Sequence, residues 1–219
     1  MTDDPVPTDP RRWEIYAPIV EGEGKGADVS GSVGAEINYG AAPDVQVTVD
    51  LPMAFSHDAG GTNWGAGDLG LSVKYRFLHD ERTGLSIAAF PALTLPTASN
   101  GMGNGMVTAF LPVWVQKDAG PWSTFAGGGY TVNPAEGSRN YWRGAVAVSR
   151  QVTPRLLFGI EAEREGADSV GGESSTRLGV GAIYQLRAPF RLLAAGGPTF
   201  QDGARHAGFH GFVALGLDY

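Results

Sequence analysis

The sequence contains no cysteine, few charged residues and no long apolar run. Without cysteine, disulfides, thiol nucleophiles and thiolate metal sites are excluded. Charged residues make up only 18% of the chain, below the roughly 25% of ordinary soluble domains. No segment approaches the ~18–20 uninterrupted apolar residues of a transmembrane helix. These absences still allow a protein that crosses a membrane with strands, because such strands are short and alternate in polarity.

Positive charge is also scarce, and the formal net charge is -7. Surfaces that bind nucleic acid are strongly basic, so we expect no nucleic-acid partner. The chain starts Met1-Thr2-Asp3-Asp4, which is acidic and unlike the basic, then apolar, start of a secretory signal peptide. For an exported protein, we expect that the signal peptide has been removed and that Met1 is an added start.

Glycine is abundant, and apolar residues recur at every second position. The 33 glycines follow no collagen period. Residues 1–11 show no periodicity and predict an N-terminal periplasmic arm, followed by one β-barrel domain over residues 12–219. In the clearest run, from Val45 to Phe55, every second residue is apolar, which is typical of strands. We predict about twelve strands, near residues 13–20, 31–39, 45–56, 68–77, 85–96, 107–117, 122–132, 141–151, 155–164, 175–186, 189–199 and 212–219.

The predicted connections alternate between long and short. The long ones are residues 21–29, 57–65, 97–106, 133–140, 165–174 and 201–208. The short ones are residues 41–44, 79–83, 118–121, 152–154 and 187–188. In an antiparallel up-and-down barrel, all odd connections lie at one end, and outer-membrane barrels have their short turns in the periplasm. The pattern therefore predicts a transmembrane barrel with both termini in the periplasm.

Alternation alone also fits a soluble barrel or a β-sandwich with its apolar face inside. The polar face, however, consists mostly of Gly, Ala, Ser and Thr, whereas water-exposed faces are rich in Lys and Glu. Aromatic residues gather near strand ends, as at a bilayer interface. We therefore predict an all-β protein of the bacterial outer membrane, surrounded by its lipids. The final aromatic, Tyr219, is expected to be a signal for the outer-membrane assembly machinery.

The charged residues of the polar face are the candidate lumen or selectivity residues. They are Glu36, Asp50, Asp68, Lys74, Arg76, Arg143, Glu161, Glu163 and Arg177. We expect Lys74 and Arg76 to lie next to Asp50 and near Asp68, and Glu161 and Glu163 to face Arg143 and Arg177. The sequence leaves open whether these groups only pair and rigidify the barrel or also select solutes.

No cofactor, metal or catalytic site is predicted. Residues 65–70 fit the spacing G-x-G-x-x-G, but a strand follows where a dinucleotide site requires a helix. We expect His57 and His206 in outer loops, His79 in a short turn and His210 on the polar face of the last strand. On a strand, His206 and His210 would be ~13 Å apart, too far to share one metal ion.

Several short motifs, taken in order, resemble one known family. Residues 64–70 run into Lys74-Tyr75-Arg76-Phe77, and residues 95–97 precede a glycine-rich loop. Further on, residues 120–122 lead to the sequence Gly127-Gly128-Gly129-Tyr130. The order is similar to that of an outer-membrane transporter family associated with the meta-pathway of phenol degradation. The resemblance implies a β-barrel that moves small, often aromatic, compounds, and it implies no catalytic residues.

The leading hypothesis is a passive pore or uptake channel for small solutes, with aromatic or hydrophobic compounds as candidates. A closed barrel with a structural or adhesive role is the alternative. A barrel enzyme and a soluble ligand-binding barrel are less favoured.

Overall fold

The computed structural model describes residues 4–204 and 206–219, and in these residues the fold is all-β. Fourteen strands are found there: β1 (Trp13–Lys25), β2 (Asp28–Ala42), β3 (Val45–Asp58), β4 (Gly61–Ala66), β5 (Leu69–Asp80), β6 (Leu85–Ala89), β7 (Ala92–Leu95), β8 (Thr108–Ala119), β9 (Trp122–Val132), β10 (Tyr141–Thr153), β11 (Leu156–Glu165), β12 (Ser175–Gln185), β13 (Phe190–Gln201) and β14 (Gly208–Asp218). Within the described ranges, the structure contains no helix suited to crossing a membrane.

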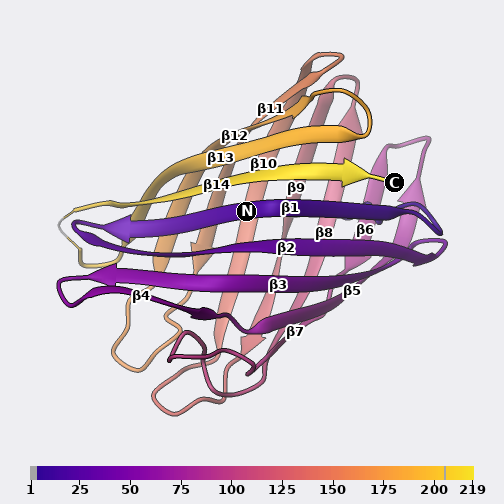
Figure 1. The fold of residues 1–219 in the computed structure, drawn as a ribbon. Coiled ribbons are helices and arrows are strands. Elements are labelled where there is room, and N and C mark those ends of the chain that lie inside the picture. Colours follow the sequence, from indigo (N-terminus) through magenta and orange to yellow (C-terminus); the bar gives the residue numbers. More distant parts are fainter. Residues whose placement is uncertain (1–3, 205) are drawn as a thin grey trace.

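The fourteen strands form the twelve strands of a closed antiparallel barrel. Both β4 and β5 pair with β3, so they are one barrel strand interrupted at Gly67 and Asp68. Likewise β6 and β7 both pair with β5 and β8, and Phe90 and Pro91 separate them. Neighbours along the chain are neighbours in the sheet, and β1 closes the barrel against β14. Figure 1 shows β1 and β14 side by side, with β8–β11 crossing behind them. The predicted twelve-strand barrel is confirmed.

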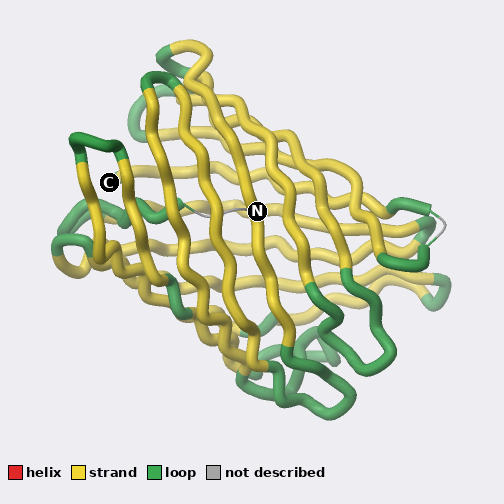
Figure 2. Tube along the Cα trace, turned by 180° about the vertical axis from the view of Figure 1, so that it is seen from behind, coloured by secondary structure: helices red, strands yellow, loops and turns green. Residues whose placement is uncertain are grey.

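The closing pair also brings the two chain ends together. The Trp13 amide donates to the Tyr219 carbonyl over 2.7 Å, and the Tyr219 amide donates to the Trp13 carbonyl over 2.8 Å. The short turn between β2 and β3 lies at this same end, where Gly40 pairs with Gln46. We call this end the terminal end and the other the loop end. The larger connections gather at the loop end, as the green segments of Figure 2 show.

Two of the predicted long loops are wrong. The first, over residues 21–29, is a continuation of β1 and β2 that ends in a two-residue turn after Lys25 pairs with Asp28. Gly26 adopts a φ of 67° there, which glycine accepts without steric cost. The second, over residues 57–65, is the hairpin of β3 and β4, so His57 lies in a strand. Both segments are polar and glycine-rich, and backbone pairing continues through them because neither property prevents it.

One irregularity in β1 reverses which residues face inward. The register shifts between Tyr16 and Ile19 on both sides of the strand. Pro18 lies in this gap and has no amide hydrogen to donate to a neighbouring strand. As a result Tyr16 and Ile19, three positions apart, share the inner face, where Tyr16 pairs with Gly216 and Ile19 with Ala214.

The outside of the barrel is apolar. Large apolar side chains project from the middle of the strands and stay exposed, for example Leu111 at 55% and Ile160 at 56%. Aromatic pairs lie near the strand ends: Trp13 with Tyr39 at the terminal end, and Tyr130 with Trp142 at the loop end. An apolar band between aromatic rings matches the polarity of a bilayer, whose apolar core lies between two interfaces that favour aromatic side chains. The soluble barrel with an apolar interior is therefore wrong for this chain.

The exposure of this band gives a first prediction. We expect Ile160→Arg to lower the free energy of unfolding by about 2–4 kcal/mol, because a guanidinium on the lipid face is poorly solvated near the bilayer midplane. The measurement is urea-induced unfolding of the protein folded into lipid vesicles. Val170→Arg is the control, because Val170 is 73% exposed but lies in the connection between β11 and β12. Equal losses for the two variants would mean that Ile160 faces water.

Candidate functional site

Polar side chains are buried on the inner face of the barrel. Most buried side chains of the described residues are polar or charged, and they come from strands all round the wall. They are Asn38, Gln46, Thr48, Ser72, Lys74, Ser86, Gln116, Thr131, Ser149 and Glu163. A polar interior enclosed by an apolar exterior is the reverse of a soluble core, and it defines a lumen.

The segment predicted as a periplasmic arm lies partly inside this lumen. Pro5 and Pro7 are buried against the barrel wall. The arm is joined to β2, where Pro10 bridges to Gly40 and the Arg11 amide donates to the Gly40 carbonyl over 2.7 Å. Any Cβ on Gly40 would meet the Asp9 carbonyl oxygen well inside van der Waals contact. Glycine at position 40 therefore allows the arm to enter along the wall.

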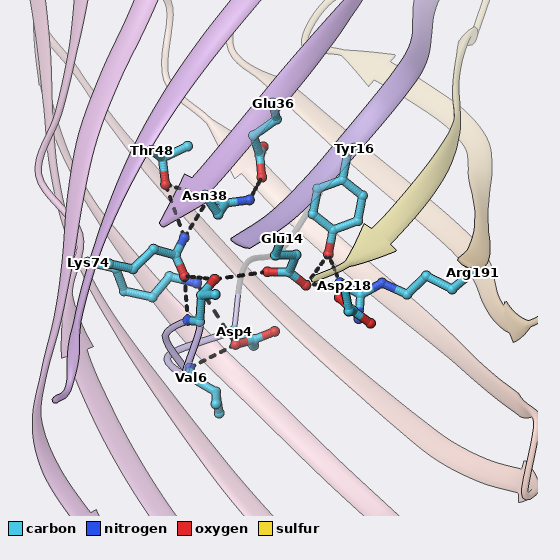
Figure 3. Close-up of polar contacts among 12 residues, drawn as sticks. Asp4, Val6, Glu14, Tyr16, Glu36, Asn38, Thr48, Lys74, Arg191 and Asp218 are labelled. Carbon is cyan, nitrogen blue, oxygen red and sulfur yellow. Dashed lines mark hydrogen bonds and ion pairs between the residues drawn. The ribbon is translucent and has the colours of Figure 1, made fainter. Parts of the chain in front are cut away.

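Polar side chains on the wall hold the arm in place (Figure 3). The Lys74 ammonium lies 3.9 Å from the Asp4 carboxylate. The Thr8 amide donates to the Gln46 side-chain oxygen over 2.8 Å, and the Thr8 hydroxyl donates to Glu14 over 3.3 Å. Gln46 in turn donates to Asn38 over 2.7 Å. Since these bonds replace the water that the buried groups would otherwise need, the arm and wall form one polar network.

A second set of charges lies at the terminal end, beside the arm. The Arg191 guanidinium pairs with Glu14 and lies 3.3 Å from Asp218. The central carbon of the Arg191 guanidinium lies 5.1 Å from the centroid of the Tyr16 ring. The Tyr16 hydroxyl donates to Glu14 over 2.8 Å. The cluster links β1, β13 and β14, and so it also ties together the strands that close the barrel.

A third cluster lies toward the loop end and surrounds Glu163, which is only 4% exposed. Arg143 on β10 approaches its carboxylate to 3.2 Å, and Arg177 on β12 approaches it to 2.9 Å. Arg177 also pairs with Glu23 on β1 over 3.0 Å. Glu165 lies 3.8 Å from Arg143 and 3.7 Å from Arg177. Glu163 thus contacts both arginines, and the chain of pairs extends past β13 and β14 to β1.

Three cavities follow one another along the lumen. The outer one, about 460 Å³, is lined by Glu23, Glu165 and Arg177, among others. The middle one, about 430 Å³, is lined by Glu36, Glu161 and apolar residues of β9–β14, and we call it the chamber. The inner one, about 610 Å³, lies beside the arm and opens at the terminal end. Asp4, Tyr16 and Glu36 line both the chamber and the inner cavity, so these two adjoin.

The Glu163 cluster separates the chamber from the outer cavity. On β11, Glu161 lines the chamber and Glu165 lines the outer cavity, and Glu163 lies between them. The ion pairs of Glu163 with Arg143 and Arg177 therefore lie in the lumen between these two cavities.

The other predicted lumen residues have different neighbours. Arg76 pairs with Asp44 in the turn between β2 and β3, over 2.6 Å. Asp50 pairs across the strands with Glu36. Asp68 accepts hydrogen bonds from the amides of Ala98 and Asn104, over 2.9 and 3.0 Å, and so fixes the connection between β7 and β8. Of the predicted lumen residues, Glu36 and Glu161 line the chamber, whereas Asp68 binds the connection between β7 and β8.

Two of the four histidines line a cavity of the lumen. His57 and His206 both line the outer cavity. His210 faces inward, as predicted, and lies 3.2 Å from the Thr199 hydroxyl. His79 is in β5, and not in a turn, and it contacts Ser86 over 2.9 Å. Within the part of the chain that the structure describes, no group of three His, Asp or Glu side chains could hold a metal ion.

Sequence reasoning missed the insertion of the arm and three residues of the clusters: Tyr16, Glu23 and Arg191. Arg191 could have been found, because it alternates with Leu193 and Ala195 on the inner face of β13. Glu23 was hidden in a segment assigned to a loop. The arm has no periodicity, so no sequence signal placed it inside the barrel.

Comparisons with known proteins agree with this geometry. The family model described as "Putative MetA-pathway of phenol degradation" matches residues 24–213. An outer membrane channel from Pseudomonas putida F1 has a TM-score of 0.72 and 13% identity, covering 100% of this chain and 97% of that one. The KdgM porin, solved in complex with disordered oligogalacturonate, has a TM-score of 0.65 and 8% identity, covering 94% and 99%. The CymD monoaromatic hydrocarbon channel has a TM-score of 0.57 and 8% identity, covering 96% and 89%. At these identities the likeness concerns the fold. No curated protein matches the chain.

The close fit of the arm at Gly40 gives a second prediction. We expect Gly40→Ala to displace the arm from the wall, because the added methyl group and the Asp9 carbonyl cannot occupy the same space. Trypsin should then cleave after Arg11 or Arg12 roughly tenfold faster in the folded, detergent-solubilised protein, since cleavage of a native segment follows its open population. Mass spectrometry identifies the fragment.

The control for this variant is Gly211→Ala, because a Cβ at position 211 has its nearest neighbour, the Ala195 carbonyl oxygen, at 3.9 Å. Identical cleavage rates for Gly40→Ala, Gly211→Ala and the parent would contradict the described position of the arm against the wall at Gly40.

The Glu163 cluster gives a third prediction. We expect Glu163→Gln to lower the free energy of unfolding by about 1.5–3 kcal/mol, the usual contribution of a hydrogen bond to a charged group. The neutral amide leaves Arg143 and Arg177 with less compensating charge. Denaturant unfolding in vesicles measures the change, and Glu136→Gln in the exposed connection between β9 and β10 is the control. A loss no larger than that of the control would rule out a stabilising role for the cluster.

Proposed function

The chain belongs to the family described as "Putative MetA-pathway of phenol degradation", and from this premise we propose that it is a passive channel for the uptake of small solutes across the bacterial outer membrane. The observation that carries the proposal is the row of three cavities inside a closed barrel whose outer face is apolar. Such a wall isolates a polar path from lipid, which is the physical requirement for a pore.

The solutes that we propose are small and have an aromatic or hydrophobic body. The family description supports this, as does the fold shared with a channel described as one for monoaromatic hydrocarbons. The chamber wall supports it independently, because Phe125, Leu157, Ile183 and Phe212 line it. An apolar body on this wall would gain roughly 25 cal/mol for each Å² removed from water.

The same proposal includes the orientation. Outer-membrane barrels have short periplasmic turns and longer external loops. We therefore place the terminal end, with the arm and both chain ends, in the periplasm and the outer cavity on the cell surface. We assign the exposed Tyr219, at the end of the closing strand, as the contact for the assembly machinery, and the apolar band as the contact for outer-membrane lipids.

The second candidate is a closed barrel with a structural or adhesive role, and the inserted arm favours it. The arm occupies the lumen beside the inner cavity, so it reduces the space that a solute can use. The proposal of a channel rather than an enzyme is supported by the lumen, where Arg143 and Arg177 are engaged in ion pairs across strands with Glu163 and Glu23.

Conductance separates the two candidates and is the fourth prediction. We expect the purified protein in a planar bilayer to show small single-channel currents, and deletion of residues 4–9 to increase the conductance about twofold or more, since less of the ~10–12 Å lumen would then be filled. Gly211→Ala should conduct like the parent. Absence of current in both the parent and the deletion variant would refute the pore and leave the closed barrel.

A further inference from the structure

Ser149, on the wall of the chamber, has a buried hydroxyl that no other described residue satisfies. The residue lines the chamber from β10 and is 7% exposed, and its hydroxyl oxygen has no hydrogen-bond partner in the described residues. It lies an even number of positions from Arg143 on the same strand, so both side chains face the lumen. Buried hydroxyls are nearly always bonded, so Ser149 has a bonding capacity that the described side chains leave unused.

The residues beside Ser149 on the neighbouring strands leave its hydroxyl open to the chamber. On β9 its partner is Ser123, whose own hydroxyl donates to the Asp118 carboxylate. On β11 its partner is Gly159, which has no side chain to cover it and also lines the chamber. A Cβ at position 159 would lie 3.3 Å from the Ser149 Cβ. Glycine at this position therefore prevents crowding of the hydroxyl from the β11 side.

The wall around this hydroxyl is apolar. Phe125 on β9 and Leu157 on β11 line the chamber on either side of β10. Leu157, Ile183 and Leu193 form one row across three adjacent strands, because Leu157 pairs with Ile183 and Ile183 pairs with Leu193. Small-molecule sites combine apolar walls, which give affinity, with a few polar groups that fix orientation. The chamber has both elements, and Ser149 supplies the polar one.

A solute with a hydroxyl group and an apolar body fits this wall better than water or a hydrocarbon does. Water can bond Ser149, but it gains nothing from the apolar row beside it. A hydrocarbon is favoured by the row, yet it displaces water from Ser149 and leaves the hydroxyl without a partner, which costs free energy. An alcohol buries its apolar body on the row and bonds Ser149 at the same time.

On the basis of the proposed pore, we infer that the chamber binds aromatic or alkyl solutes that have a hydroxyl group, in preference to the corresponding hydrocarbons. Ser149 is the specificity-determining residue, because it bonds the hydroxyl of the solute. The apolar row on β11, β12 and β13, together with Phe125, receives the body of the solute.

Block of the current through the protein in a planar bilayer tests this preference. Benzyl alcohol and toluene are probes of similar size that differ in the hydroxyl group. We expect benzyl alcohol to halve the current of the parent protein at a lower concentration than toluene does, because a site that bonds a hydroxyl rejects the analogue without one. A purely apolar chamber would give the opposite order, because burying a hydroxyl without a partner costs free energy. This comparison needs no variant to fold.

A variant then tests the role of Ser149. We expect Ser149→Ala to raise the half-blocking concentration of benzyl alcohol about twofold to tenfold, the effect of one neutral hydrogen bond. The half-blocking concentration of toluene should stay the same or fall, since the variant has no hydroxyl to leave unpaired. Ser123→Ala is the control, because Ser123 lies beside Ser149 but its hydroxyl is bonded to Asp118, and it should change neither value. An equal rise for both probes in Ser149→Ala would mean that Ser149 only shapes the wall, and would overturn the inference.

The outcomes separate this inference from the function on which it rests. A protein that conducts but is blocked by neither probe, or by toluene at least as well as by benzyl alcohol, refutes the inference and leaves the pore. A protein that shows no current, with or without residues 4–9, refutes the pore itself. Where only the variant without residues 4–9 conducts, the same order of block is expected of it, and the opposite order refutes the inference.

Discussion

Backbone hydrogen bonding between β1 and β14 is the constraint on which the structure depends. In lipid, an unpaired amide or carbonyl has no water to bond, so a sheet can cross the membrane only when it has no free edge. The reciprocal bonds between Trp13 and Tyr219 complete that closure at the terminal end. Closure then creates two surfaces of opposite character. The outer one is covered by apolar side chains, and the inner one must satisfy every polar group in a confined volume.

The inner surface meets that demand with pairs and networks rather than with water alone. Arg191, Arg143 and Arg177 each lie against at least two carboxylates. The arm takes part in the same way, through Thr8 on Gln46 and Asp4 near Lys74. Between these groups lies the chamber, where an apolar wall and carboxylates coexist. The inward charges have two physical effects, because a charge that rigidifies the wall also sets the local potential.

The accuracy of the sequence predictions depended on whether the signal was periodic. Strands such as β3 alternate strictly, so the strand order and the inward faces of Glu36, Glu163 and Arg177 were predicted from the sequence. The family was predicted from the order of the short motifs. The loops predicted at residues 21–29 and 57–65 were wrong, because glycine and polar residues are typical of loops although the backbone continues to pair there. Asp68 was predicted to point into the lumen, yet it accepts bonds from a loop that lies thirty or more positions along the chain. Which loop lies beside Asp68 depends on how far neighbouring strands are shifted along one another, and no local sequence pattern encodes that shift.

The sequence by itself determined the all-β architecture, the apolar outer and polar inner faces, and the aromatic residues at the strand ends. It did so because a period of two fixes which face each residue occupies. Only the tertiary structure decided what fills the lumen. The arm has no period, and it can run along the wall because Gly40 leaves space for the backbone of Thr8 and Asp9. The chamber likewise exists only when β2 and β9–β14 curve round to face one another. Faces are set by neighbours along the chain, whereas the lumen is set by residues that meet across the closed barrel.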